Sequence, residues 1–219
     1  MGSMLNNDMG YACKFADFLT QSFHPVKTIT SGEGGSILSN NKVIDSELKL
    51  LRSHSMKKTL DKPLWFYEIN EPGHNFRLSD IHSVLGLSQL RKIDKFVKLR
   101  RNIAKIYNFL FKDKINLVTP IEKKNVYHSY HLYPLQIDFY KLKINKDEFF
   151  KKMYKRGIKL QVHYIPIFMQ PYYKKKYKLN PKSFPNAYNF YKKTISLPIY
   201  PNLKKREINL IIKNIFNLI

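Results

Sequence analysis

Cysteine is almost absent from this 219-residue chain, and so are long apolar runs. The one cysteine, Cys13, cannot form an internal disulfide, which excludes a disulfide-stapled secreted domain and fits a reducing cytoplasm. No apolar run reaches the length of a membrane span, and the opening residues lack the basic start and apolar middle of a signal peptide. We therefore expect a cytoplasmic protein without a membrane partner.

Acidic residues are also scarce: 16 of them stand against 39 lysines and arginines, which gives a net charge of +23. Such an excess is typical of proteins that bind nucleic acids or membrane surfaces. Arginine, whose planar guanidinium suits phosphate contacts, supplies only seven of the 39 basic residues. The remaining lysines accompany abundant Asn, Ile, Tyr and Phe, a mixture that a genome rich in A and T encodes. We expect no specific nucleic-acid partner, although a basic nucleic-acid-binding module stays open as an alternative class.

Two further kinds of site lack their residue patterns. The sequence GEGG at residues 32–35 fits neither the P-loop nor the dinucleotide fingerprint. A zinc site would need His128, His131 and His163, but two histidines three apart in a strand-like run point to opposite faces, and no thiolate or carboxylate lies nearby. We therefore expect no metal.

The hydrophobic pattern predicts a chain of mixed helices and strands. Its composition, 43% hydrophobic and 25% charged, is ordinary for one large or two modest domains. In the first half the predicted elements are short buried strands at 18–23 and 35–40, a one-faced helix at 42–54 and a loop at 55–76. In the second half they are a helix pair or one bent helix over 80–111 with Ser79 as N-cap, a strand at 130–137, a helix at 145–156 closed by Gly157, a strand at 159–164, and helices at 184–193 and 203–218.

The first half is centred on the sequence SFHPVK at residues 22–27, which leaves a predicted strand and leads into GEGG at residues 32–35. A lysine that follows a strand and precedes three glycines lies where the backbone can pass closely round a bound group. Such a position is typical of a Schiff-base lysine. Because lysines are so common here, a surface lysine after a strand is the alternative.

These segments resemble the DegT/DnrJ/EryC1/StrS sugar aminotransferases, and look closest to the pseudaminic-acid branch of that family. The resemblance covers nearly the whole chain and rests on separate motifs in the same order: SFHPVK with GEGG in 22–35, RSH at 52–54, GHNFRLSDI at 73–81, LGLSQL at 85–90 and QVHYIP at 161–166. It implies an α/β protein, a PLP-dependent transferase of fold type I (aspartate aminotransferase-like). The end of the large cofactor-binding domain would be residues 1–105, and the α+β small domain residues 106–219.

The resemblance also implies the site. Lys27 matches the catalytic lysine that carries pyridoxal 5'-phosphate as an imine and moves the proton, because an amine is a nucleophile when neutral and an acid when charged. Ser22 matches a serine that binds the cofactor phosphate, and Asn75 an asparagine that reaches the phosphate in the neighbouring subunit. His163 and Tyr164 match a rim that contacts the nucleotide sugar. Taken locally, Ser22 is also a plain strand-end serine, Asn75 a turn residue, and His163 and Tyr164 core aromatics.

The implied reaction passes an amino group, from glutamate as donor, to a 4-keto UDP-6-deoxy-sugar. The implied enzyme is a homodimer, and the aromatic residues Trp65, Phe66 and Tyr67 of the predicted loop would pack on the second subunit. An inactive remnant of such an enzyme is the alternative.

The start of the chain leaves two interpretations open: residues 1–4 are a remnant of tag removal, or residues 1–14 match a family segment that follows an aspartate beside the cofactor's ring nitrogen. That carboxylate keeps the ring protonated. Neither Asp8 nor Asp17 replaces it. On the second interpretation the chain is truncated, and we expect these 219 residues alone to be poorly soluble and a poor transaminase.

Overall fold

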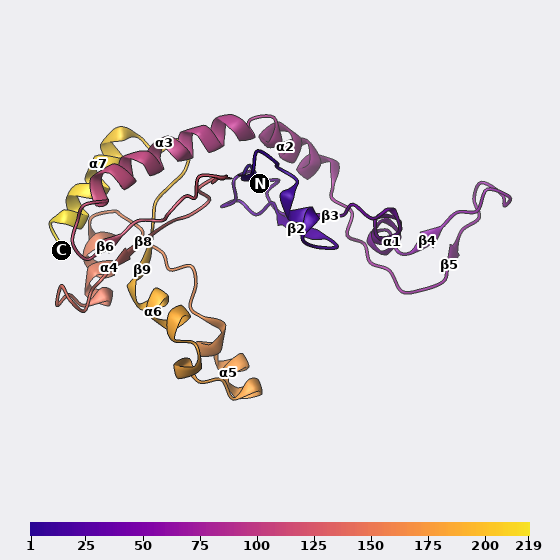
Figure 1. Ribbon diagram of the computed structural model, residues 1–219. Coiled ribbons are helices and arrows are strands. Elements are labelled where there is room, and N and C mark those ends of the chain that lie inside the picture. The colour runs from indigo at the N-terminus through magenta and orange to yellow at the C-terminus, as the bar shows by residue number, and fades with distance from the viewer. The chain divides into compact units, whose positions relative to one another are not determined.

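The computed structural model describes all 219 residues, which form two compact units (Figure 1). Unit 1 consists of residues Met1–Asp94 and Lys124–Tyr127, and unit 2 of Lys95–Lys123 and His128–Ile219. Helix α3 (Ile93–Phe111) runs without a break through residue 105, where the sequence predicts the domain boundary. That boundary stays a prediction. None of the helices has both the length and the apolar character needed to cross a membrane.

Unit 1 is built from antiparallel strand pairs and two helices. Its elements in chain order are β1 (Met4–Leu5), the 3-10 helix η1 (Tyr11–Lys14), β2 (Leu19–Ser22), β3 (Gly35–Leu38), α1 (Lys42–Arg52), β4 (Met56–Lys57), β5 (Glu68–Ile69), α2 (Asp80–Leu90) and β7 (Val126–Tyr127). Strand β1 pairs with β7, β2 with β3, and β4 with β5. The register of the second pair places Leu19 opposite Leu38 and Ser22 opposite Gly35.

The two strands predicted at 18–23 and 35–40 are confirmed as β2 and β3, but the prediction that they are buried is wrong. Phe18 is 55% exposed and Leu38 41% exposed. Each strand has only one neighbouring strand, so one edge and much of both faces meet solvent.

Capping side chains start the helices of unit 1 where the sequence predicts. Asn41 accepts a hydrogen bond from the Val43 N–H at 2.8 Å and begins α1, and Ser79 accepts one from the His82 N–H at 3.4 Å and begins α2. The helical stripe over 80–111 is a pair of helices, α2 and α3. The predicted loop at 55–76 contains the short strand pair β4 and β5. Strands of two residues are too short to show a hydrophobic period in the sequence.

Unit 2 contains a three-stranded antiparallel sheet in the order β6-β8-β9, with helices packed against it. Its elements after α3 are β6 (Leu117–Val118), β8 (Tyr133–Ile137), α4 (Lys146–Lys155), η2 (Ile167–Met169), α5 (Pro171–Tyr177), η3 (Pro181–Ser183), α6 (Pro185–Lys193), β9 (Thr194–Leu197) and α7 (Lys205–Phe216). Every second residue of β8 is buried in the core, as its alternating sequence predicts. Helix α7, yellow in Figure 1, lies beside the C-terminal end of α3, where the Phe111 and Phe216 rings meet edge to face.

The strand predicted at 159–164 is wrong. Only Gln161 pairs there, through an isolated bridge to Ser196 of β9. One bridge does not make a ladder, and Pro166 soon turns the chain into η2. Strand β9 itself was not predicted, because its four buried residues follow α6 directly and show neither alternation nor a preceding turn signal.

A partly buried ion pair joins the segment after β6 to helix α3. Arg101 contacts the Glu122 carboxylate with both terminal nitrogens, and the His128 N–H donates to Glu122 Oε1 at 2.7 Å. Burial raises the pKa of Glu122, but the hydrogen bonds from Arg101 and His128 outweigh it, so the pKa lies below its ordinary value.

Glu122→Gln is expected to lower the free energy of unfolding by about 1–3 kcal/mol at pH 7, because charge-assisted hydrogen bonds are lost. A carboxyl whose pKa is lowered by folding stabilises above its unfolded pKa of about 4.3 and loses that effect as pH falls through the folded value. The deficit of the variant should therefore shrink at pH 3. Urea unfolding at both pH values measures it, with Asp113→Asn, at an 82% exposed side chain, as control. A deficit that is the same at both pH values would contradict the role of the charge.

Candidate functional site

The connection between β2 and β3 carries Lys27 and is closed at its base by backbone hydrogen bonds. The Phe23 N–H donates to the Gly34 carbonyl at 2.9 Å, and the Ser31 N–H donates to the Phe23 carbonyl at 3.1 Å. Within it, the Lys27 N–H donates to the His24 carbonyl at 2.9 Å and forms a tight turn. The side chain of Lys27 is half-buried, so the amine sits at the edge of a folded loop.

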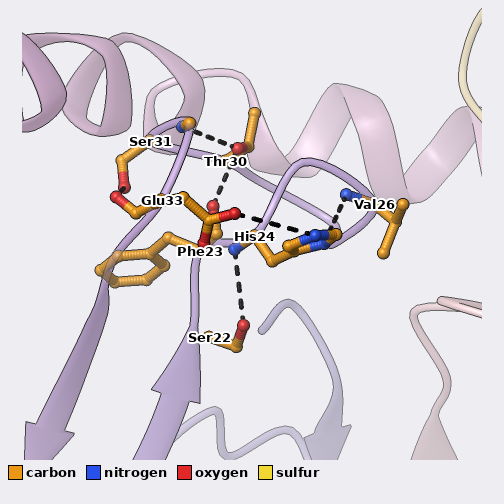
Figure 2. Close-up of polar contacts among 8 residues, drawn as sticks. Ser22, Phe23, His24, Val26, Thr30, Ser31 and Glu33 are labelled. Atoms are coloured by element: carbon orange, nitrogen blue, oxygen red, sulfur yellow. Dashed lines mark hydrogen bonds and ion pairs between the residues drawn. The ribbon is translucent and has the colours of Figure 1, made fainter.

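Side-chain hydroxyls hold the loop in shape (Figure 2). Thr30 Oγ1 donates to the Phe23 carbonyl at 2.8 Å and accepts from the Gly32 N–H at 2.9 Å. Ser31, which is completely buried, donates from Oγ to the Glu33 carbonyl at 2.7 Å. These bonds satisfy the loop backbone without a helix or a ladder, so the lysine is presented by a fixed turn.

His24 and Glu33 face each other across the loop in Figure 2, a contact that the sequence analysis did not assign. His24 Nε2 lies 3.8 Å from Glu33 Oε1, and the Val26 N–H points at His24 Nδ1 at 3.4 Å. An acceptor at Nδ1 leaves the proton on Nε2, which is the nitrogen that faces the carboxylate. The sequence signal for this contact was a histidine and a carboxylate, His24 and Glu33, within the same short motif at residues 22–35.

The structure places Ser22 at the end of β2, where the loop that carries Lys27 begins. Ser22 is the last residue of β2, its side chain is exposed, and its Oγ accepts from the His24 N–H at 3.4 Å. In Figure 2 this hydroxyl points toward the backbone at His24, where the chain turns toward Lys27.

Two glycines are needed for the loop to close. Gly34 has φ +142, and a Cβ there would lie 2.9 Å from Leu78 Cδ1 and 2.9 Å from Ser31 Oγ. A Cβ on Gly35 would lie 2.6 Å from the Gln21 carbonyl oxygen. All three distances are shorter than real Cβ contacts, so this backbone path requires glycine.

Asn75 lies on a different segment of unit 1, beside the end of α1. It forms an isolated antiparallel bridge with Ser53, and the Phe76 N–H donates to the Arg52 carbonyl at 2.9 Å. The Asn75 side chain is exposed, and no hydrogen bond joins it to Ser22 or Lys27. The structure therefore leaves the amide available at the surface without bringing it to the lysine within the chain.

His163 and Tyr164 belong to unit 2. His163 Nδ1 lies 2.8 Å from Ser196 Oγ, and the two aromatic rings meet edge to face with centroids 4.8 Å apart. Tyr164 is 70% exposed, so it is not a core aromatic. The structure contains no group of three His, Cys, Asp or Glu side chains placed to hold a metal ion.

Comparison with known proteins agrees with the motifs. Residues 1–216 match the model of the DegT/DnrJ/EryC1/StrS aminotransferase family. The chain is 37% identical to the UDP-4-amino-4,6-dideoxy-N-acetyl-β-L-altrosamine transaminase of Campylobacter jejuni, over 93% of this chain and 53% of that protein. The solved structure of Helicobacter pylori PseC, an aminotransferase involved in the biosynthesis of pseudoaminic acid, superposes with a TM-score of 0.84 at 35% identity and covers 93% of this chain and 53% of that one.

A sugar aminotransferase structure in its PLP form, Spr1654 from Streptococcus pneumoniae, superposes with a TM-score of 0.85 at 27% identity, over 99% of this chain and 55% of that one. The chain thus spans about half the length of the relatives it matches. The likeness confirms the predicted α/β class, fold type I. The chain belongs to the DegT/DnrJ/EryC1/StrS aminotransferase family.

Proposed function

We propose that this chain serves a pyridoxal-phosphate-dependent transamination that passes an amino group from glutamate to a 4-keto UDP-6-deoxy-sugar in glycan biosynthesis. The observation that carries the proposal is the half-buried Lys27 on a hydrogen-bonded loop that only glycine can close at Gly34 and Gly35. The name of the Campylobacter relative supports the sugar class. The PLP form of the Streptococcus neighbour supports the cofactor.

The residues of the loop fit pyridoxal phosphate. Lys27 supplies a primary amine at the edge of the fold, and the exposed Ser22 hydroxyl supplies a neutral donor for a phosphate oxygen. When bound, pyridoxal phosphate supplies an aldehyde carbon that receives the amino group and a ring that withdraws electrons from the reacting carbon.

Each candidate site residue would then have a defined task. Lys27 would hold the cofactor through its amine, which is a nucleophile when neutral, and would move the proton at the reacting carbon as an acid when charged. Ser22 donates to the phosphate, and Asn75 donates its amide N–H to the phosphate held by a second subunit. His163 and Tyr164 hold the nucleotide part of the sugar, which the exposed Tyr164 ring suits by stacking.

The proposal includes a homodimer, in which the exposed amide of Asn75 would reach the phosphate bound to the other subunit. It also places the reaction in the cytoplasm, a reducing compartment that suits the unpaired thiol of Cys13.

Covalent trapping tests the proposal directly. Pyridoxal phosphate is added to the protein, borohydride fixes the adduct, and peptide mapping locates the label. We expect the label on the peptide with Lys27 in the wild type and in Lys42→Ala, an exposed lysine at the start of α1, and we expect it to be lost in Lys27→Ala. Label that is scattered over surface lysines and unchanged in Lys27→Ala would overturn the assignment.

A further inference from the structure

Unit 2 contains a cavity of about 730 Å³ that has no part in the proposed transamination. Its walls come from the residues that follow β8, from the first two turns of α4, from Val162 and from the end of α6. This volume lies within the range of about 300–1,000 Å³ that is typical of small-molecule sites.

Apolar and aromatic side chains form most of the cavity wall. Phe139, Phe150, Val162 and the ring of Tyr191 line it. Phe139 is buried, whereas Phe150 and Tyr191 are half-buried. The two half-buried rings therefore keep exposed surface that a ligand in the cavity can cover. Such a wall favours a flat apolar ligand, in particular an aromatic ring.

One cationic group is fixed in the wall. Lys146, the first residue of α4, donates from Nζ to the Tyr191 carbonyl at 2.7 Å and to the Thr194 carbonyl at 3.0 Å. Its Nζ also lies 5.1 Å from the centroid of the Tyr191 ring. An ammonium group has three protons, and these two carbonyls take two of them, so one donor is left for a ligand.

The other charges around the cavity are mainly positive. Lys151, Lys192 and Lys193 line it together with Asp138 and Asp147. Lys193 pairs with Asp138 at 2.7 Å, which cancels one charge of each sign. Lys146, Lys151 and Lys192 then face a single carboxylate, Asp147, and the balance attracts an anion.

We propose that this cavity binds a small aromatic phosphate, with the ring against Phe150 and Tyr191 and the phosphate on Lys146. Because two carbonyls already hold the ammonium in place, little of its side-chain entropy remains to be lost on binding. Lysine is also a common phosphate ligand, as a point charge. The exposed Lys151 and Lys192 add attraction at the rim.

Binding to the full 219-residue chain tests the proposal with three probes: phenyl phosphate, inorganic phosphate and phenol. Calorimetry should give phenyl phosphate an affinity at least tenfold above that of either part alone, because only the whole probe uses both the ring wall and the ammonium. Lys27→Ala should bind phenyl phosphate as the wild type does, which separates this cavity from the proposed cofactor site. Equal affinities for phenyl phosphate and inorganic phosphate would overturn the proposal.

Variants locate the probe. Lys146→Met should weaken phenyl phosphate about tenfold or more, whereas Lys152→Met, an exposed lysine of α4 outside the lining, should not. If Lys146→Met unfolds, the double variant Lys151→Glu with Lys192→Glu, at two exposed positions, should weaken binding in a chain that keeps Lys146. Unchanged affinity in these variants would overturn the proposal.

The pH dependence of the affinity for phenyl phosphate is a further test, because a lysine with a purely structural role would not produce it. Burial lowers the pKa of Lys146 to about 8, against a smaller raising effect of Asp147. Affinity for phenyl phosphate should therefore fall between pH 7 and about 9 as the ammonium loses its proton. In Lys146→Met this fall should be absent, and a fall of the same size in that variant would count against the assignment.

Discussion

Replacing Arg100 with leucine is expected to lower the free energy of unfolding of unit 2 by roughly 3 kcal/mol or more. Arg100 is only 5% exposed, inside the apolar stripe of α3. Its Nη1 lies 3.3 Å from the Tyr130 carbonyl, 3.2 Å from the His131 carbonyl and 2.8 Å from the Ile199 carbonyl, and its two protons are shared among the three. One guanidinium therefore fastens α3 to both the approach to β8 and the exit from β9.

The size of the effect follows from what leucine leaves behind. Each carbonyl that loses its donor in a buried place costs about 1–3 kcal/mol, and leucine supplies no replacement. Burial lowers the pKa of Arg100, but a guanidinium stays charged in the physiological range, so the wild-type contact does not depend on pH there.

Hydrogen exchange measured by mass spectrometry checks this prediction, because it reports on α3, β8 and β9 separately from unit 1. Their amides should exchange faster in Arg100→Leu. Arg156→Leu, at the exposed C-cap of α4 in the same unit, is the matched control and should change little. Arg100→Lys should recover part of the loss, since an ammonium can still donate to some of these carbonyls. Exchange as slow as in the wild type would show that the three bonds contribute little.

Features that depend on neighbouring residues were predictable from the sequence. The helix at α4 begins at Asn145, whose side chain accepts from the N–H groups of Asp147 and Glu148, and ends before Gly157 at φ +76. The turn at Lys27 was equally accessible, because its strand, its lysine and its glycines lie within one short motif. Local chemistry decides these features, and the sequence displays it.

Features that depend on distant residues were not predictable in this way. Arg100 contacts a carbonyl 99 residues further along the chain, and Lys146 contacts one 48 residues further along. Nothing in the local pattern distinguishes them from the other basic residues, except that Arg100 falls on the buried stripe between Val97 and Ile103. The site rests on the same distinction: Ser22 and Lys27 share a loop, while the predicted role of Asn75 requires a second chain.

Mixing two defective variants is expected to restore sites that neither variant forms alone. On the proposed shared site, Lys27→Ala lacks the amine and Asn75→Ala lacks the amide that the neighbouring subunit supplies. After subunit exchange at equal amounts, half of the dimers are mixed and each has one intact site, so about one quarter of the wild-type sites should return. Pyridoxal phosphate fixed by borohydride on Lys27 measures them.

The surface before Asn75 is the reason to expect such a dimer. Leu60 is 107% exposed, Leu64 95% and Trp65 77%, all in the segment between β4 and β5. Several exposed large apolar side chains in one short segment are typical of a protein interface, and this segment lies close in sequence to the amide that must reach the other subunit. Light scattering that shows a monomer at working concentration would contradict the shared site.

A second mixture distinguishes a site shared between chains from simple stabilisation of one variant by the other. Ser22 and Lys27 lie on the same loop of one chain, joined through the turn at His24. In a mixed dimer of Ser22→Ala and Lys27→Ala, each site therefore carries one of the two defects and none is intact. This mixture should recover nothing above its two components, while the mixture of Lys27→Ala with Asn75→Ala recovers about one quarter of the sites. Equal recovery in both mixtures would mean that the amide of Asn75 acts within its own chain or not at all.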